Sequence, residues 1–407
     1  VQYKAWMPHI HADFHEQGYT SPYYFAPAAA PFHEYITDWQ GEFQTEIGKN
    51  HARYFDREGW LYFTRELFDL LYPSYGDTWP TFNGAIGMTY EQAGHGRAGR
   101  AIDLPTGDTL TLYDRIAHHR TTSLSTVEIA SKESSRLKEN FRKYFQNAMD
   151  NPQGEYRTYV ISAETPRGKM RSLVKLLNRN GIEYGFATEG YSGSMYSYKS
   201  NKNEAAGVNV GDLVISAHQP RSVLTQVLFD PEVMVEDSVT YDITAWSVPF
   251  AYGLDAYASK DRLKVKTEPG SENDFAEPMD PLQGKDLTRA YAFVVPWTDI
   301  TSAAFLGDAV SAGINVRTAP NEIVFGDQTF APGAVIINVG DNRKVKDLKT
   351  TVQRLAKKHL VDIKVLETGF STKGGDLGSG RYDLVGKPKL VGVDPLTAEH
   401  GNFGLTN

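Results

Sequence analysis

Three histidines and an aspartate alternate near the start of the chain, at His9, His11, Asp13 and His15. In a β-strand every second side chain points to the same face, so a strand here would line up all four groups. Imidazole and carboxylate groups bind zinc through bonds near 2 Å, but along a strand His9 and His15 would be roughly 20 Å apart. Only neighbours two residues apart could therefore share one metal ion.

Two metal-site patterns are similar to parts of this stretch. A His-x-His pair at a strand end is similar to amidohydrolase sites, which would make His9 and His11 the ligands of a metal enzyme. His-x-His-x-Asp-His is typical of metallo-β-lactamase-like hydrolases, but His15 stands one residue too late for it. We favour the alternative that His9 and His11 are hydrogen-bonded residues inside a sheet.

The elements that must position these residues follow from hydrophobic periodicity. We predict a strand over residues 5–15, helices over 34–55 and 61–71, and a buried strand over 84–90 that ends at Glu91. Apolar residues at helical spacing predict one long amphipathic helix over 112–149. The sequence Asp-Asn-Pro-Gln-Gly at 150–154 then breaks the helix and predicts a domain boundary.

Beyond this boundary, short apolar strands alternate with helices up to about residue 366. Such alternation is typical of a doubly wound parallel sheet. The sequence therefore predicts an α/β protein with two domains, residues 1–150 and 151–407.

Composition excludes several classes of protein. The 407 residues include no Cys, so a disulfide scaffold, a thiolate metal site and a cysteine nucleophile are excluded. A formal charge of −8 argues against a nucleic-acid partner, which needs a concentrated basic face. No stretch approaches the roughly 20 apolar residues of a membrane span.

Several short motifs, in the right order, resemble the zinc carboxypeptidases of the M14 type. They are Asp13-Phe14-His15-Glu16-Gln17-Gly18, Pro22-Tyr23-Tyr24-Phe25, Tyr72-Pro73-Ser74-Tyr75-Gly76-Asp77 and Gly87-Met88-Thr89-Tyr90-Glu91-Gln92-Ala93-Gly94. The resemblance covers residues 1 to about 150. It implies that this part is the C-terminal portion of a carboxypeptidase-like mixed sheet with helices on both faces.

The resemblance implies a role for individual residues. His15 would be the third zinc ligand and Glu91 the general base, while Asp13 would orient its neighbours. Tyr75, or else Tyr72, would be a mobile residue that covers the bound C-terminal residue of a peptide substrate. The alternative is that both tyrosine rings only pack a loop.

Two further features bear on this interpretation. Arg97 follows the catalytic strand in a Gly-rich loop, where we expect it to bind a substrate carboxylate or to pair with local acids rather than to bind phosphate. The His-x-x-Glu motif that supplies the first two zinc ligands of the family would have to precede Val1. We therefore expect an N-terminally incomplete enzyme that is inactive unless the missing segment is supplied.

The remainder, 151–407, resembles the class I glutamine-amidotransferase-like, flavodoxin-like domain appended to large bacterial members. Without Cys it cannot perform amidotransferase chemistry, and we expect a packing or recognition module. The resemblance implies a periplasmic or extracellular protein. The main alternative is a non-catalytic peptide- or glycan-binding protein on the same fold.

Overall fold

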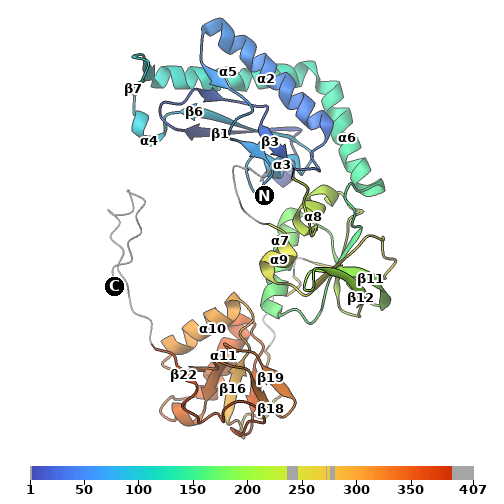
Figure 1. Ribbon diagram of the computed structural model, residues 1–407, viewed down its shortest axis with the longest axis vertical. Helices are drawn as coiled ribbons and strands as arrows, with labels where there is room; N and C mark the ends of the chain where they lie inside the picture. The colour runs from blue at the N-terminus through green and yellow to red at the C-terminus, as the bar shows by residue number, and fades with distance from the viewer. Residues whose placement is uncertain (1, 236–245, 272, 276–279, 387–407) are drawn as a thin grey trace. The chain divides into compact units, whose positions relative to one another are not determined.

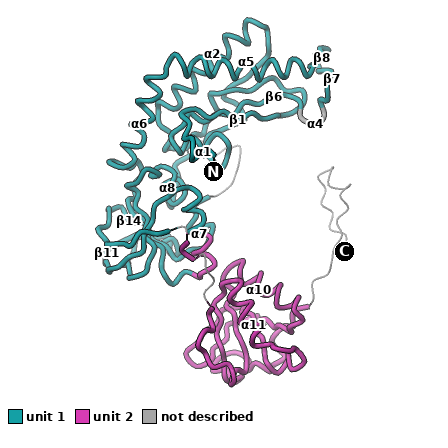
Figure 2. Tube along the Cα trace, turned by 180° about the vertical axis from the view of Figure 1, so that it is seen from behind, with its two compact units in different colours: residues 1–165, 173–272 teal, residues 166–172, 273–407 magenta. Residues whose placement is uncertain are grey.

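The computed structural model describes residues 2–235, 246–271, 273–275 and 280–386. Helices and strands are mixed throughout, which confirms the α/β class (Figure 1). The chain divides into two compact units, residues 1–165 with 173–272, and residues 166–172 with 273–407 (Figure 2). The boundary that we predicted after residue 150 coincides with the end of a helix and lies within the first unit.

The first sheet has the strand order β1-β6-β2-β4. Strands β1 (Ile10–Gln17) and β6 (Ile86–Ala93) run parallel over eight residue pairs. The short strands β2 (Tyr23–Tyr24) and β4 (Tyr62–Phe63) extend the sheet beyond β6. The strand predicted over 5–15 is wrong at its start, where Gln2–Trp6 forms helix α1.

Helices α2 (Asp38–Glu58) and α5 (Leu112–Lys132) pack together and against β6 (Figure 1). The core between them and the sheet is largely aromatic and aliphatic and includes Tyr23, Phe25, Phe43, Ile47, Phe55, Ile86, Met88 and Tyr90. Alternate side chains of β6 therefore enter this core, and the intervening ones face the opposite side of the sheet. The long helix predicted over 112–149 is divided at Glu133 into α5 and α6 (Ser134–Asp150).

The helix predicted over 61–71 is also wrong. This segment forms β4 and, after a turn, β5 (Asp69–Leu70), which pairs with β3 (Ala29–Phe32). Its apolar residues are numerous enough for a helix, but pairing with neighbouring strands satisfies its backbone instead. Smaller elements complete this region: α3 (Thr78–Thr81), α4 (His95–Ala98), β7 (Ala101–Asp103) and β8 (Thr109–Thr111).

The second sheet of the first unit has seven strands in the order β12-β11-β14-β9-β13-β10-β15. They are β9 (Thr158–Ile161), β10 (Gly185–Ala187), β11 (Tyr191–Ser197), β12 (Lys202–Val208), β13 (Leu213–Ser216), β14 (Ala256–Ser259) and β15 (Thr267–Pro269). Helices α7 (Arg167–Asn180), α8 (Ser222–Phe229) and α9 (Val248–Tyr252) accompany them.

Buried contacts join the two sheets of this unit. Asp230 is 3 % exposed and accepts hydrogen bonds from the hydroxyls of Tyr35 and Tyr159. Tyr35 comes from the part of the unit that holds the first sheet, and Tyr159 comes from the central strand of the second sheet. One carboxylate therefore ties the two parts together.

The second unit holds a five-stranded sheet in the order β21-β16-β20-β17-β22, covered by helices α10 (Ile300–Ser311) and α11 (Leu348–His359). The strands are β16 (Ala292–Val295), β17 (Arg317–Thr318), β20 (Val335–Asn338), β21 (Lys364–Leu366) and β22 (Asp383–Leu384). A hairpin of β18 (Ile323–Phe325) and β19 (Gln328–Phe330) and a 3-10 turn, Gly340–Asn342, complete the unit.

The parallel, doubly wound sheet predicted for 151–407 is wrong. Every described strand pair in the five- and seven-stranded sheets is antiparallel. Strand and helix lengths along the chain resemble a series of crossovers, but strand direction depends on which end of the sheet each connection returns to. Among the described helices, none is both long enough and apolar enough to cross a lipid bilayer.

Candidate functional site

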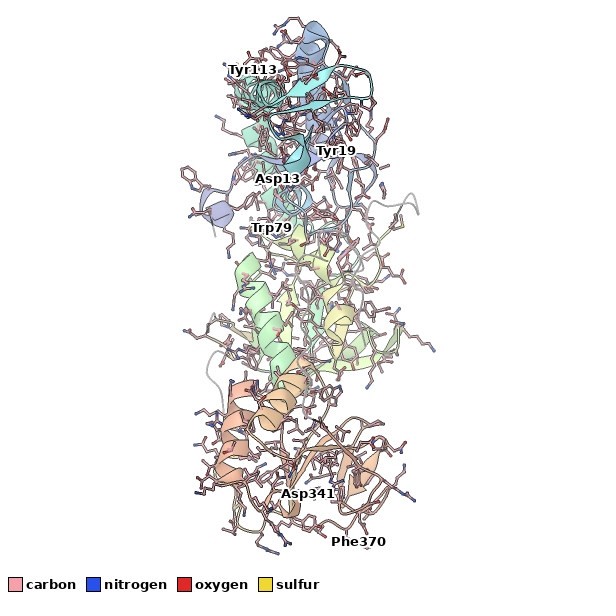
Figure 3. All side chains as sticks on the ribbon, turned by 90° about the vertical axis from the view of Figure 1, so that its left-hand side faces the viewer. Asp13, Tyr19, Trp79, Tyr113, Asp341 and Phe370 are labelled. Atoms are coloured by element: carbon pink, nitrogen blue, oxygen red, sulfur yellow. The ribbon has the colours of Figure 1, made fainter. Side chains whose placement is uncertain are left out.

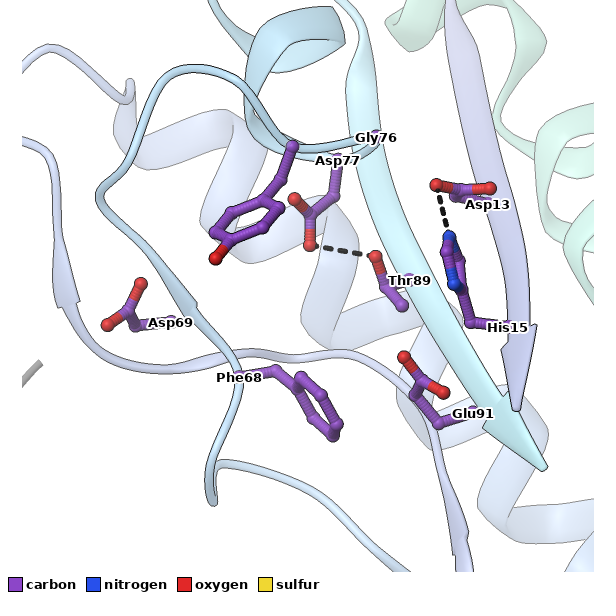
Figure 4. A pocket seen from close by; sticks show the side chains of 9 residues that line it. Asp13, His15, Phe68, Asp69, Gly76, Asp77, Thr89 and Glu91 are labelled. Carbon is purple, nitrogen blue, oxygen red and sulfur yellow. Dashed lines mark hydrogen bonds and ion pairs between the residues drawn. The ribbon is translucent and has the colours of Figure 1, made fainter. Parts of the chain in front are cut away.

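The parallel pairing of β1 and β6 brings the two main candidates together. His15 lies directly opposite Glu91, and Asp13 lies directly opposite Thr89. Neighbouring strands are about 4.8 Å apart, and residues paired in this way point to the same face of a sheet. All four side chains therefore project from the face opposite the α2–α5 core (Figure 4).

These side chains form one side of a cavity of about 240 Å³ (Figure 4). The other side comes from the segment that follows β4 and leads to α3. The complete lining is Asp13, His15, Phe68, Asp69, Tyr75, Gly76, Asp77, Thr89 and Glu91. Four carboxylates and one imidazole thus surround a space that holds a single amino-acid side chain or a small molecule.

The carboxylate of Glu91 is largely removed from solvent, and one of its oxygens is free to accept a hydrogen bond. The residue is 7 % exposed, and its Oε2 is buried without a hydrogen-bond partner in the described part of the chain. Burial raises its pKa to about 7; His15 lowers it, and the negative charges of Asp13 and Asp77 raise it further. A carboxyl group with a pKa near neutrality suits general acid–base catalysis.

Asp13 fixes the orientation of His15. Its Oδ2 lies 2.9 Å from Nε2 of the imidazole, and the side chain of His15 remains 56 % exposed. Because Asp13 engages Nε2, the other ring nitrogen, Nδ1, is the atom that can meet a metal ion or a substrate. An orienting role for Asp13, as the resemblance implies, would use this contact.

Gly76 makes room for that arrangement. A Cβ added to Gly76 would lie 1.7 Å from Oδ2 of Asp13 and 2.6 Å from its Cγ. Both distances are far below van der Waals contact, so the carboxylate that holds His15 occupies the space that any other side chain at 76 would need.

Asp77 supports the opposite wall. It is buried, accepts a hydrogen bond from the Thr78 amide at 2.7 Å and another from the Thr89 hydroxyl at 2.9 Å. The first bond caps the short helix α3, and the second ties the wall to β6. Burial raises the pKa of Asp77, with the two hydrogen bonds opposing the shift.

The two candidate tyrosines occupy different positions. Tyr75 lines the cavity. The ring of Tyr72 packs edge to face against the ring of Tyr75, and the two ring centroids are 5.3 Å apart. Arg97 lies on α4, beyond the end of β6, and its side chain falls outside the described residues.

Sequence reasoning gave no role to five residues of the lining, namely Phe68, Asp69, Gly76, Asp77 and Thr89. Thr89 stands two residues before Glu91 on the same strand, so the alternation of side chains could have identified it. Phe68 and Asp69 lay inside the segment wrongly predicted as a helix, and no local pattern connects them with β1 or β6. Only the folding of residues 64–77 across the sheet face brings them to the cavity.

His9 and His11 do not join this cavity. The His9 ring lies 4.2 Å from that of Phe141, and the His11 ring lies 5.7 Å from that of Tyr3, measured between centroids. Burial lowers the pKa of both imidazoles. We favoured hydrogen-bonded histidines inside a sheet: His11 does lie on β1, whereas His9 precedes it, and the contacts of both rings in the described part of the chain are aromatic.

A catalytic zinc site requires about three protein ligands and an open position. Within the described residues there is no group of three His, Asp or Glu side chains placed to hold a metal ion. At the cavity the only imidazole is that of His15, and its nearest carboxylate is already bonded to Nε2. These residues could supply one ligand and do not by themselves form a zinc site.

Comparisons of the chain with protein-family models, with curated proteins and with solved structures gave no match in any of the three.

Proposed function

We propose that the cavity between β1 and α3 belongs to a zinc-dependent carboxypeptidase, which removes the C-terminal residue of a peptide. The observation that most favours this function is the parallel register that sets His15 beside Glu91 at one cavity. The short motifs shared with zinc carboxypeptidases assign those two residues to the metal and to the general base. A single imidazole means that zinc depends on ligands outside the described residues.

Glu91 is the proposed proton carrier. Its unpartnered Oε2 can accept a proton from a water molecule as the water oxygen attacks the scissile carbonyl carbon. When the C–N bond breaks, the same proton passes to the leaving amine nitrogen. Both transfers need a carboxyl group that holds a proton weakly near neutral pH, which its raised pKa provides.

The charge of the cavity favours a cationic group on the substrate. Asp13, Asp69, Asp77 and Glu91 line it, and no described Lys or Arg does. A lysine or arginine side chain at the C-terminal position of the peptide would offset this negative charge. Tyr75 is placed at the same wall to cover the bound residue.

The test combines zinc binding with peptide hydrolysis. This chain should bind zinc weakly, and His15→Ala should abolish that binding. Release of C-terminal amino acids should be measured on this chain and on any longer natural form that adds ligands, with Glu91→Gln as the variant. Hydrolysis that survives Glu91→Gln at the wild-type rate would exclude the proposed role of Glu91.

A second candidate is a non-catalytic peptide-binding protein. The observation that favours it is the lack of a three-ligand group in the described part of the chain, although the cavity itself is formed. Binding of peptides in the presence of a metal chelator, without hydrolysis by any longer form, would favour this candidate. For either function we propose a periplasmic or extracellular location, where such proteins meet peptides.

A further inference from the structure

The cavity wall formed by residues 72–83 has little regular structure of its own. It provides Tyr75, Gly76 and Asp77 to the lining and continues into α3, a helix of four residues. Within the wall, the Thr78 hydroxyl donates to the Tyr72 carbonyl at 2.5 Å and accepts from the Tyr75 amide at 3.2 Å. From the rest of the first unit, Gln40 donates to the Thr81 carbonyl at 3.0 Å and Tyr144 to the Phe82 carbonyl at 2.9 Å. A helix this short does not fix its own position.

Residues 173–272 contact this wall at two polar points. Nε1 of Trp79 donates to Oδ1 of Asn180, at the end of α7, at 2.9 Å. A guanidinium nitrogen of Arg221, the residue before α8, donates to Oδ1 of Asn83 at 2.7 Å. Trp79 lies where the part of the unit that carries Asp13 meets the part formed by residues 151–272 (Figure 3).

An aromatic contact reaches the cavity more directly. The ring centroid of Trp246 lies 6.0 Å from that of Tyr72, which in turn packs against Tyr75. Trp246 is itself held on its far side, because its Nε1 donates to the Val227 carbonyl in α8 at 2.9 Å and its ring contacts His33. The rings of Trp246, Tyr72 and Tyr75 thus form a continuous series from α8 to the cavity lining.

We infer that residues 173–272 contribute to positioning the cavity wall, beside the bonds that tie it to β6, α2 and α6, and that Trp246 is a positioning residue that sets the place of Tyr75 through Tyr72. This gives a specific role to part of the region that the sequence predicted to be a packing or recognition module. Three separate contacts, from α7, from the start of α8 and from the segment before α9, converge on one short stretch of the wall. The inference that these contacts position the wall does not depend on the proposed function. The inference that the position of the wall affects peptide binding does rest on it.

Hydrogen exchange tests the placement without any assay of function. Trp246→Ala removes the ring contact and should speed amide exchange in residues 72–83 by about tenfold, with α2 unchanged. Trp246→Phe keeps a ring beside Tyr72 and should restore most of the protection. Trp297→Ala, at a tryptophan that is 46 % exposed in the second unit, is the matched control and should change nothing in 72–83.

Two exchange results would overturn the inference. One is wild-type exchange of residues 72–83 in Trp246→Ala, and the other is an equal rise in α2, which indicates general destabilisation. Should Trp246→Ala not fold, Asn180→Ala removes the bond to Trp79 and should give the same local rise in exchange. A protected wall in Asn180→Ala would then be the contradicting result.

Peptide binding tests the consequence for the site. Trp246→Ala should weaken binding of a peptide that ends in lysine by about tenfold, and Trp246→Phe should bind nearly as the wild type does. If wild-type protein does not bind the peptide, the proposed function fails and the exchange result still decides the positioning. Unchanged binding by Trp246→Ala despite faster exchange would refute the link between Trp246 and the cavity.

Discussion

Replacing Glu91 by glutamine should stabilise the first unit at alkaline pH and leave it almost unchanged at acid pH. Because burial raises the pKa of Glu91 from 4.5 to about 7, the folded state favours the protonated form. The protonated Glu91 side chain contributes fully to the stability of the folded state below pH 4.5, and this contribution is lost as the pH rises through about 7. That change in pKa corresponds to a loss of about 3 kcal/mol, which glutamine avoids because it carries no charge.

Urea unfolding at pH 4 and pH 8 measures this difference. Tryptophan fluorescence is a suitable signal, since five of the six tryptophans lie in the first unit. The buried imidazoles of His33 and His51, whose pKa values burial lowers to about 3, titrate in both proteins and cancel in the comparison.

The control is Glu66→Gln, at an exposed glutamate outside the cavity lining. We expect its effect on the free energy of unfolding to be the same at both pH values. The gain from Glu91→Gln should grow by about 2 to 3 kcal/mol between pH 4 and pH 8. A gain that is equal at the two pH values would refute the reasoning about this carboxylate.

Three further substitutions have definite expected outcomes. Gly76→Ala should displace Asp13 and change the imidazole NMR signals of His15. Unchanged signals would contradict the predicted clash between the alanine Cβ and the Asp13 carboxylate. Asp77→Asn keeps the helix cap but removes a charge, so it should weaken binding of peptides ending in lysine by roughly tenfold and spare those ending in leucine. Asp230→Asn should cost about 1–3 kcal/mol of unfolding free energy in urea, because two buried tyrosine hydroxyls share its carboxylate.

Local sequence patterns and the resemblance identified Asp13, His15 and Glu91 on the two strands of the candidate site, but not Thr89. Asp13 and His15 alternate on one strand, and Glu91 stands at the end of a strand that was predicted to be buried. Such patterns are reliable here because side-chain direction along a strand is fixed by the backbone itself. The wall opposite them was not predictable in the same way, since Phe68 and Asp69 sit in a segment whose apolar spacing suggested a helix, whereas pairing with distant strands makes it extended.

By itself, the sequence determined the mixed α/β class, the main amphipathic helices, the absence of thiol chemistry and the side chains that share a strand face. Only the tertiary structure decided that His15 lies opposite Glu91, that the later sheets are antiparallel, and that Trp246 meets Tyr72. The physical reason is that the periodicity of apolar residues shows which face of its own helix or strand each residue occupies. Strand partners and long-range contacts depend instead on where the connections return the chain, which no local pattern specifies.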